Sequence, residues 1–182
     1  MSEGGDAEHV EAEIGGDLVV IVDLLSLHNQ IVYYRERRRV MDYTVKETRD
    51  LDYEEVADIF FEVGFLRYSE KRAIYKEAIE KAFRNSQYVV SVWDGEEMVG
   101  FARVLTDKAL FATIWNMLVK PDYQGGGVGK QLINKCLKKY PDLHFFLIAD
   151  KEVGGFYEKV GFRKHKNAMY YEKGKQVCVL YN

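Results

Sequence analysis

The stretch PDYQGGGVGK, residues 121–130, determines how the rest of the sequence is interpreted. Gly125, Gly126 and Gly127 are followed by Gly129 and a basic residue. An apolar run precedes the glycines and a helical pattern follows them, so the predicted order is strand, glycine loop, helix. Such a loop places consecutive backbone N–H groups at a helix N-terminus, where the helix dipole favours an anion. The expected ligand is a phosphate; the alternative is a glycine-rich helix start that binds nothing.

Two familiar phosphate-binding loops do not fit this stretch. A P-loop needs a glycine, four residues, and then Gly-Lys followed by Ser or Thr. Here Gln131 follows Gly129-Lys130, and Gln124 occupies the position of the first glycine. The dinucleotide fingerprint G-x-G-x-x-G also fails, because its third glycine would fall on Lys130 or Leu132. A nucleotide-dependent phosphotransferase is therefore disfavoured.

A third pattern fits, and it resembles a known family. The run QGGGVG, residues 124–129, matches Q/R-x-x-G-x-G/A, the pyrophosphate loop of the GNAT N-acetyltransferase superfamily. Downstream, GFYEKVGF at residues 155–162 resembles that family's aromatic-Tyr-Glu helix, at the usual separation and with one predicted strand between the two motifs. The resemblance extends from about Tyr43 to Glu172, and it leans toward a subgroup with plastid and cyanobacterial members.

The resemblance implies an acetyl-CoA-dependent N-acetyltransferase. The acetyl group would pass to a primary amine by direct attack in a ternary complex. The acceptor would be a small-molecule amine or the lysine or N-terminal amine of a protein. A non-catalytic acyl-CoA sensor or interaction module remains the second hypothesis. No nucleic acid, membrane or metal partner is expected, and the protein is expected to be a monomer or a homodimer.

The resemblance also implies where the reaction occurs. The family binds acetyl-CoA between two parallel strands that splay apart, here residues 113–119 and 144–149. Tyr157 matches the acid that protonates the departing thiolate. One backbone N–H from the first strand polarises the thioester carbonyl. The implied cofactor-binding residues are Met117, Leu118, Val119, Gln124, Gly125, Gly126, Gly127, Val128, Gly129 and Lys130.

Two parts of the site are not determined by the motifs. Many relatives have an asparagine seven residues before the tyrosine, where this chain has Asp150. The general base is expected to be a water relay, with Asn116, His144 and Glu62 as alternatives. Aromatic residues that could line an acceptor pocket or pack in the core are Phe65, Tyr68, Trp115, Tyr170 and Tyr171.

The order of predicted elements indicates a mixed α/β fold. Together with the resemblance it predicts a GNAT-type central mixed sheet of six to seven strands, splayed between strands 4 and 5 and flanked by about four helices. Residues 1–40 are expected to be a partly disordered N-terminal extension, since the first sixteen are acidic and glycine-rich. Residues 41–182 are expected to form the acetyltransferase domain.

The helical patterns give specific expectations. Asp52 is expected to cap one helix, with Glu55 reaching back to it and Gly64 ending it. A second helix, capped by Ser69, is expected to have an inward face made of Ile74, Ala78 and Ala82.

The strand patterns predict a hairpin that turns at Asp94-Gly95. The continuous apolar run at residues 143–149 predicts a buried strand. Residues 168–172 and 176–181 are predicted to be the final strands.

The overall composition is that of an ordinary globular protein. The 182 residues are 47% hydrophobic, with a formal net charge of -3, which does not favour a nucleic-acid binder. Cys136 and Cys178 do not form a disulfide framework, which indicates a reducing compartment. The acidic start shows no targeting pattern, so a cytoplasmic location is expected.

Overall fold

The computed structural model describes residues 9–13, 18–23, 32–36, 43–66 and 71–169. The chain divides into two compact units, Met1–Asp42 and Tyr43–Asn182. The first unit holds an antiparallel sheet of three strands: β1 (His9–Glu13), β2 (Leu18–Asp23) and β3 (Val32–Glu36). Strand β1 lies in the acidic stretch of the predicted N-terminal extension and pairs antiparallel with β2.

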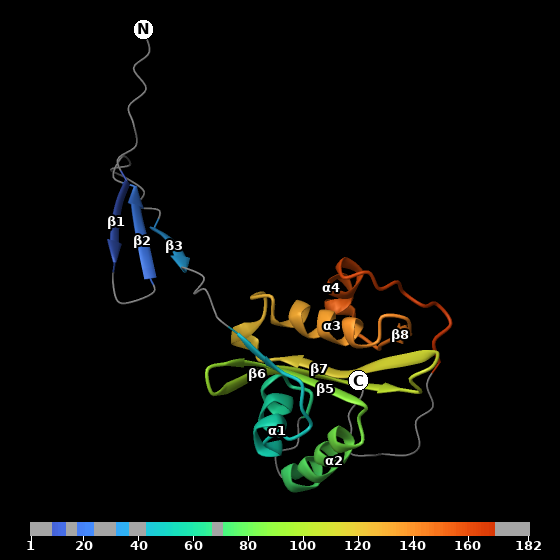
Figure 1. Cartoon of the computed structure of the whole chain (residues 1–182). Helices are drawn as coiled ribbons and strands as arrows, with labels where there is room; N and C mark the ends of the chain where they lie inside the picture. The colour runs from blue at the N-terminus through green and yellow to red at the C-terminus, as the bar shows by residue number, and fades with distance from the viewer. Residues whose placement is uncertain (1–8, 14–17, 24–31, 37–42, 67–70, 170–182) are drawn as a thin grey trace. The chain divides into compact units, whose positions relative to one another are not determined.

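The second unit is a five-stranded mixed sheet with helices on both faces. Its strands, in sheet order, are β4 (Thr44–Lys46), β5 (Tyr88–Asp94), β6 (Glu97–Thr106), β7 (Phe111–Val119) and β8 (His144–Phe146). Only β7 and β8 run parallel among these neighbours. Helices α1 (Tyr53–Glu62) and α2 (Arg72–Arg84) cover one face, and α3 (Val128–Lys139) and α4 (Gly154–Lys159) cover the other (Figure 1).

The mixed α/β prediction with about four helices is confirmed, with a smaller strand count. The described part of this unit has five sheet strands rather than six or seven. The two predicted final strands lie outside the described residues, apart from Ala168 and Met169. None of the described helices is long and apolar enough to cross a membrane.

Helix α1 begins at its predicted cap but without the reciprocal contact. The Asp52 carboxylate accepts a hydrogen bond from Glu54 N at 2.8 Å. Glu55 does not reach back; its carboxylate accepts from Met98 N in β6 at 2.7 Å, because that strand is irregular there and leaves the N–H without a ladder partner. The helix ends where Gly64 takes a φ of +72°.

Helix α2 buries a different face from the predicted one. Ile74 is 56% exposed, whereas Tyr75, Ile79 and Phe83 are buried. The face with the larger apolar and aromatic side chains is the buried one, because burial free energy grows with the area removed from water. The predicted cap, Ser69, lies outside the described residues.

The β5–β6 hairpin is one residue out of the predicted register. Asp94 pairs with Glu97, so the loop residues are Gly95 and Glu96 rather than Asp94 and Gly95. Gly95 takes a φ of +59°, as a tight hairpin turn requires.

Two apolar clusters hold the sheet between its helices. On the α1–α2 face, Phe101 of β6 packs against Phe83 at 5.2 Å and Phe60 at 5.5 Å between ring centroids. On the other face, Leu132 and Ile133 of α3 are fully buried against the sheet. These clusters fix the position of β7 from both sides.

Strands β7 and β8 pair over only three residues and then separate. The paired positions end at Thr113 with Phe146. Beyond this point β7 remains paired with β6 but has no strand on its β8 side among the described residues, and we call this side of residues 114–119 the open edge of β7. The predicted splay is therefore present between the fourth and fifth strands of the sheet order.

The second splayed strand is shorter and less buried than predicted. It covers only His144–Phe146, and Ile148 beyond it is 52% exposed. The prediction of a continuous buried strand over residues 143–149 is wrong, because half-buried and exposed side chains alternate along the run, as on an edge strand covered on one face.

We expect a chain that begins at Met41 to fold by itself. The two apolar clusters of the second unit are built only from residues at or beyond Tyr43 within the described chain. Thermal melting followed by circular dichroism should show one cooperative transition, compared with the full-length chain. Insoluble protein, or a broad transition, would show that residues 1–40 contribute to this core.

Candidate active site

The glycine loop has the backbone shape that its sequence predicts. After a short 3-10 turn, Pro121–Tyr123, Gly125 takes a φ of +75° and Gly127 a φ of +93°. Residues with a Cβ rarely adopt these angles. Helix α3 begins immediately afterwards, at Val128.

The loop and the first turn of α3 present a row of unsatisfied N–H donors. The first hydrogen bond into the helix runs from Gln131 N to Gly127 O at 3.0 Å. Within the described chain, no acceptor pairs with the main-chain N–H of residues 125–130. Six such donors at the positive end of a helix dipole form a site for an anion, and the exposed Lys130 adds a positive charge.

Two of the predicted cofactor-binding residues have structural tasks in the loop. The Gln124 side-chain amide donates to Val119 O at 3.0 Å, which ties the loop to the end of β7. A Cβ on Gly129 would lie 3.4 Å from Phe156 Cζ and 3.9 Å from Met117 Cε. The absence of a side chain at Gly129 therefore lets α3, α4 and β7 meet at one point.

The register of β7 determines which of its main-chain groups face the open edge. Lys120 N donates to Val99 O of β6 at 2.9 Å, and Leu118 lies opposite Phe101. Since alternate residues of a strand point their main-chain groups to opposite sides, those of Leu118 are directed toward β6. Those of Met117 and Val119 are directed toward the open edge. Of the three predicted β7 residues, Met117 and Val119 can offer main-chain groups to a ligand there, and Val119 offers only its N–H, because its carbonyl accepts from Gln124.

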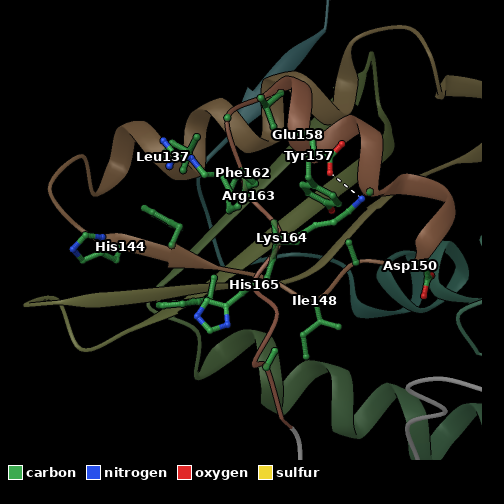
Figure 2. Close-up of a pocket in the computed structure, with 18 of the residues that line it drawn as sticks. Leu137, His144, Ile148, Asp150, Tyr157, Glu158, Phe162, Arg163, Lys164 and His165 are labelled. Carbon is green, nitrogen blue, oxygen red and sulfur yellow. Dashed lines mark ion pairs between the residues drawn. The ribbon is translucent and has the colours of Figure 1, made fainter.

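Tyr157 lies on α4, beside β8. It lines a cavity of about 980 Å³ together with Ile148, Asp150 and Phe162, among others (Figure 2). Burial, and secondarily the charge of Asp150, raises the pKa of Tyr157 to about 12. The phenol therefore keeps its proton at neutral pH and can act as a hydrogen-bond donor or an acid.

The residues that line this cavity do not include those of the glycine loop. Within the described chain it is lined by β8, α4 and the segments beside them, and by no residue of β7 or of residues 121–130. At its rim Lys164 pairs with Glu158 at 3.0 Å, the ion pair drawn in Figure 2. The connection between α4 and the loop runs instead through Phe156, which packs over Gly129.

Each alternative general-base candidate is either bonded to another side chain or lies away from the open edge. The Asn116 side-chain oxygen accepts from Arg103 Nε at 2.8 Å, and an amide is not a base. His144 pairs with Phe111 at the closed end of the two strands, away from the open edge. Glu62 lies 3.9 Å from Lys120 Nζ. Asn116 is not basic, His144 lies at the closed end, and Glu62 is held in an ion pair, so a water relay remains the expectation.

Cys136 is excluded as a covalent nucleophile. It is fully buried on α3, and burial raises the pKa of its thiol to about 12. A nucleophilic cysteine needs a thiolate, and therefore a lowered pKa and some exposure. The arrangement favours direct transfer over an acyl-enzyme intermediate.

Comparison with known proteins identifies the family. The model of the GNAT acetyltransferase domain matches residues 47–177, well over half of the chain. The chain belongs to the GNAT acetyltransferase family. The matched range contains the open edge of β7, the glycine loop and α4, the three elements described above.

Relatives from cyanobacteria and plastids confirm the predicted subgroup. The chain is 32% identical over 127 residues to the uncharacterized N-acetyltransferase ycf52-like of Prochlorococcus marinus, covering 66% of this chain and 67% of that protein. It is 28% identical over 132 residues to serotonin N-acetyltransferase 2, chloroplastic, of Oryza sativa subsp. japonica, covering 68% and 62%. The chain thus spans about two thirds of the length of each relative.

A solved structure shows the same fold. A GNAT-family acetyltransferase from Streptococcus pneumoniae TIGR4 superposes with a TM-score of 0.62 at 22% identity. The match covers 73% of this chain and 99% of the other. The fold and the family together make this GNAT protein an acyltransferase.

We expect Gly127→Asp to abolish the stabilisation of the protein by acetyl-CoA. The aspartate would be strained at a φ of +93° and would place a negative charge among donors arranged for an anion. The measurement is the rise in melting temperature on adding acetyl-CoA, since a ligand that binds only the folded state adds stability by mass action.

Gly95→Asp is the matched control for Gly127→Asp. Gly95 also has a positive φ and open space around it, but lies in the β5–β6 turn. This variant should lose stability and keep the full acetyl-CoA shift. An undiminished shift in Gly127→Asp would contradict the assignment of the loop.

Proposed function

We propose that this GNAT acyltransferase moves an acetyl group from acetyl-CoA to a primary amine by direct attack in a ternary complex. The observation that carries the proposal is the continuity of two sets of unpaired main-chain groups. The open edge of β7 offers the main-chain groups of Met117 and the N–H of Val119, whose carbonyl already accepts from Gln124, and six loop donors follow a few residues later. An extended arm that ends in a pyrophosphate matches this sequence of donors.

Acetyl-CoA would be held by the main chain along most of its length. Met117 and Val119 would pair with the pantetheine arm as a neighbouring strand does, and the N–H groups of residues 125–130 would bind the pyrophosphate. Gln124, Val128 and Gly129 shape this site, and Lys130 contributes charge. When bound, acetyl-CoA supplies an activated acetyl thioester.

A main-chain donor at the open edge would stabilise the charge that develops on the thioester oxygen. The N–H of Met117 is our assignment, because it faces the open edge and follows directly after the irregular position of β7. A fixed N–H dipole needs no reorganisation during the reaction, which is why such donors contribute strongly to catalysis.

Tyr157 would return a proton to the departing sulfur. With its pKa raised to about 12, against about 8.5 for a thiol, complete transfer is uphill by about 5 kcal/mol. The proton is useful to the extent that charge builds on sulfur in the transition state, or that the bound donor lowers the pKa. This matches general acid catalysis, which accelerates without being indispensable.

The acceptor amine must lose a proton before it attacks. With a pKa near 10.4, about 0.1% of an alkylamine is neutral at pH 7.4. The described part of the open edge contains no carboxylate or histidine. We therefore propose that water molecules on the acceptor side accept the proton of the amine and pass it to solvent.

The acceptor class is a primary amine, with an arylalkylamine as the first candidate and a protein lysine or N-terminal amine as the second. The rice relative is named for serotonin, an arylalkylamine. Release of free CoA in the presence of tryptamine, a lysine peptide and a peptide with a free N-terminus tests the function. No release with any amine, while acetyl-CoA still stabilises the protein, would favour the non-catalytic sensor, which the relatives' names do not support.

The cellular location of the protein is also part of the proposal. We place it in the cytoplasm, following the sequence, with a plastid as the alternative raised by the chloroplastic rice relative. A fluorescent fusion in the source cell distinguishes the two.

We expect Tyr157→Phe to lower kcat by about one to three orders of magnitude with little change in acetyl-CoA binding. The ring keeps its packing against Phe156 and Phe162, so the melting temperature should barely move. Tyr140→Phe, directly after the end of α3, serves as the control and should keep the parental kcat. Parental turnover in folded Tyr157→Phe would show that Tyr157 is not the acid.

The pH profile should rise without a tyrosine-dependent fall. Raising the pH deprotonates more of the acceptor amine, which increases kcat/KM until the amine is neutral. Tyr157 stays protonated well above pH 10, because its pKa is raised to about 12. Steady-state rates between pH 6 and about pH 10 should therefore show no loss of the acid. A falling limb near pH 8 that disappears in Tyr157→Phe would contradict this.

A further inference from the structure

We propose that Arg103 is a positioning residue for acetyl transfer: it holds the bulge in β7 that aims the Met117 N–H at the donor thioester. The inference rests on the proposed function and deepens it. Arg103 lies in β6, on the face covered by α1 and α2, and acts through Asn116.

The bulge is defined by the pairing of β6 with β7. Arg103 lies opposite Trp115, and Phe101 lies opposite Leu118, so that two residues of β7 face the single residue between them in β6. Asn116 is one of the two, and its φ of +48° is in the left-handed region. Asparagine tolerates this region better than most residues, yet still less readily than glycine.

Arg103 supplies a specific contact that holds Asn116 in place. Its Nε donates to the Asn116 side-chain oxygen at 2.8 Å, and its Nη1 donates to Ser86 Oγ at 3.3 Å. Ser86 is fully buried and its hydroxyl donates in turn to Ala82 O of α2 at 2.8 Å. The guanidinium also lies over the Phe83 ring, at 5.9 Å. The bulge is thereby fastened to the end of α2.

The bulge decides which main-chain groups face the open edge. Before it, Asp107 N donates to Phe111 O, so the odd-numbered residues of β7 point their groups to β6. After it, the even-numbered residues Leu118 and Lys120 do so. Without the extra residue, Met117 would turn its N–H toward β6 and Leu118 would face the open edge. The guanidinium of Arg103, through Asn116, therefore determines the direction of the Met117 N–H without touching acetyl-CoA.

The test is a double-mutant cycle between Arg103→Met and Asn116→Gly. Arg103→Met keeps the approximate length of the side chain and removes the guanidinium that bonds to Asn116 and Ser86. We expect its kcat to fall by about tenfold to a hundredfold, with the acetyl-CoA Kd changed by less than about threefold. In the Asn116→Gly background the same Arg103→Met substitution should cost less than about threefold, because glycine takes a positive φ without being held.

Arg49→Met is the matched control. Arg49 donates to the main-chain oxygens of Arg84 and Ser86, at the same end of α2, but has no contact with Asn116 in the described structure. It should lower the melting temperature and leave kcat unchanged. A purely structural role for Arg103 would give the same pattern as Arg49→Met.

Two results would overturn the proposal. One is parental kcat in folded Arg103→Met, and the other is an equal loss of kcat with Asn116 and with glycine at position 116. A further readout separates this failure from failure of the proposed function. If the parent acetylates no amine, calorimetry can still compare the Kd of acetyl-CoA with that of CoA. Arg103→Met should reduce the preference for acetyl-CoA. An unchanged preference would contradict the proposed direction of the Met117 N–H.

Discussion

Main-chain groups that no neighbouring strand satisfies are the constraint on which this structure depends. Every buried N–H and C=O needs a partner, and a strand that loses its neighbour exposes a row of them. In this protein β8 leaves β7 after Thr113, and the glycine loop then leaves six further N–H groups without acceptors in the described chain. An extended ligand with a diphosphate end, as in the proposed function, would satisfy both sets. The proposed function therefore rests on the positions at which the fold leaves its own main-chain groups unpaired.

Strand β7 is packed on both faces: Leu118 packs against one apolar cluster, and Ala112 and Ile114 belong to the other. On one face Phe60, Phe83 and Phe101 form a cluster of edge-on and tilted rings, and on the other α3 buries Leu132 and Ile133. A loosely packed strand would be free to shift and pair with β8 over a longer stretch. The two cores are thus the reason that an unpaired edge is compatible with a stable sheet.

Side chains satisfy or fasten the sheet wherever its strands are irregular. Glu55 accepts the N–H of Met98, Gln124 donates to the carbonyl of Val119, and Arg103 holds Asn116. Each replaces or supports a ladder hydrogen bond that a regular strand would make. The same side chains therefore serve folding and the geometry of the site.

The sequence by itself determined the local features of this protein. The glycine spacing from Gln124 to Gly129 specified a loop at a helix N-terminus, because positive φ and close approach require glycine. Asp52 and Gly64 marked the ends of α1 for equally local reasons. The order of strands and helices was sufficient for the mixed α/β class, and the two motifs were sufficient for the family that comparison confirmed.

Only the tertiary structure decided the features that depend on partners distant in sequence. The inward face of α2 is fixed by the rings it meets, so Tyr75, Ile79 and Phe83 are buried where the helical pattern alone also allowed Ile74. The run at residues 143–149 has the composition of a buried strand, but its exposure depends on what covers its faces. The role of Arg103 leaves no local signal, because Asn116 and Ser86 come from other elements. Periodicity and glycine spacing act within a few residues, whereas strand register and long-range hydrogen bonds exist only once the chain has folded.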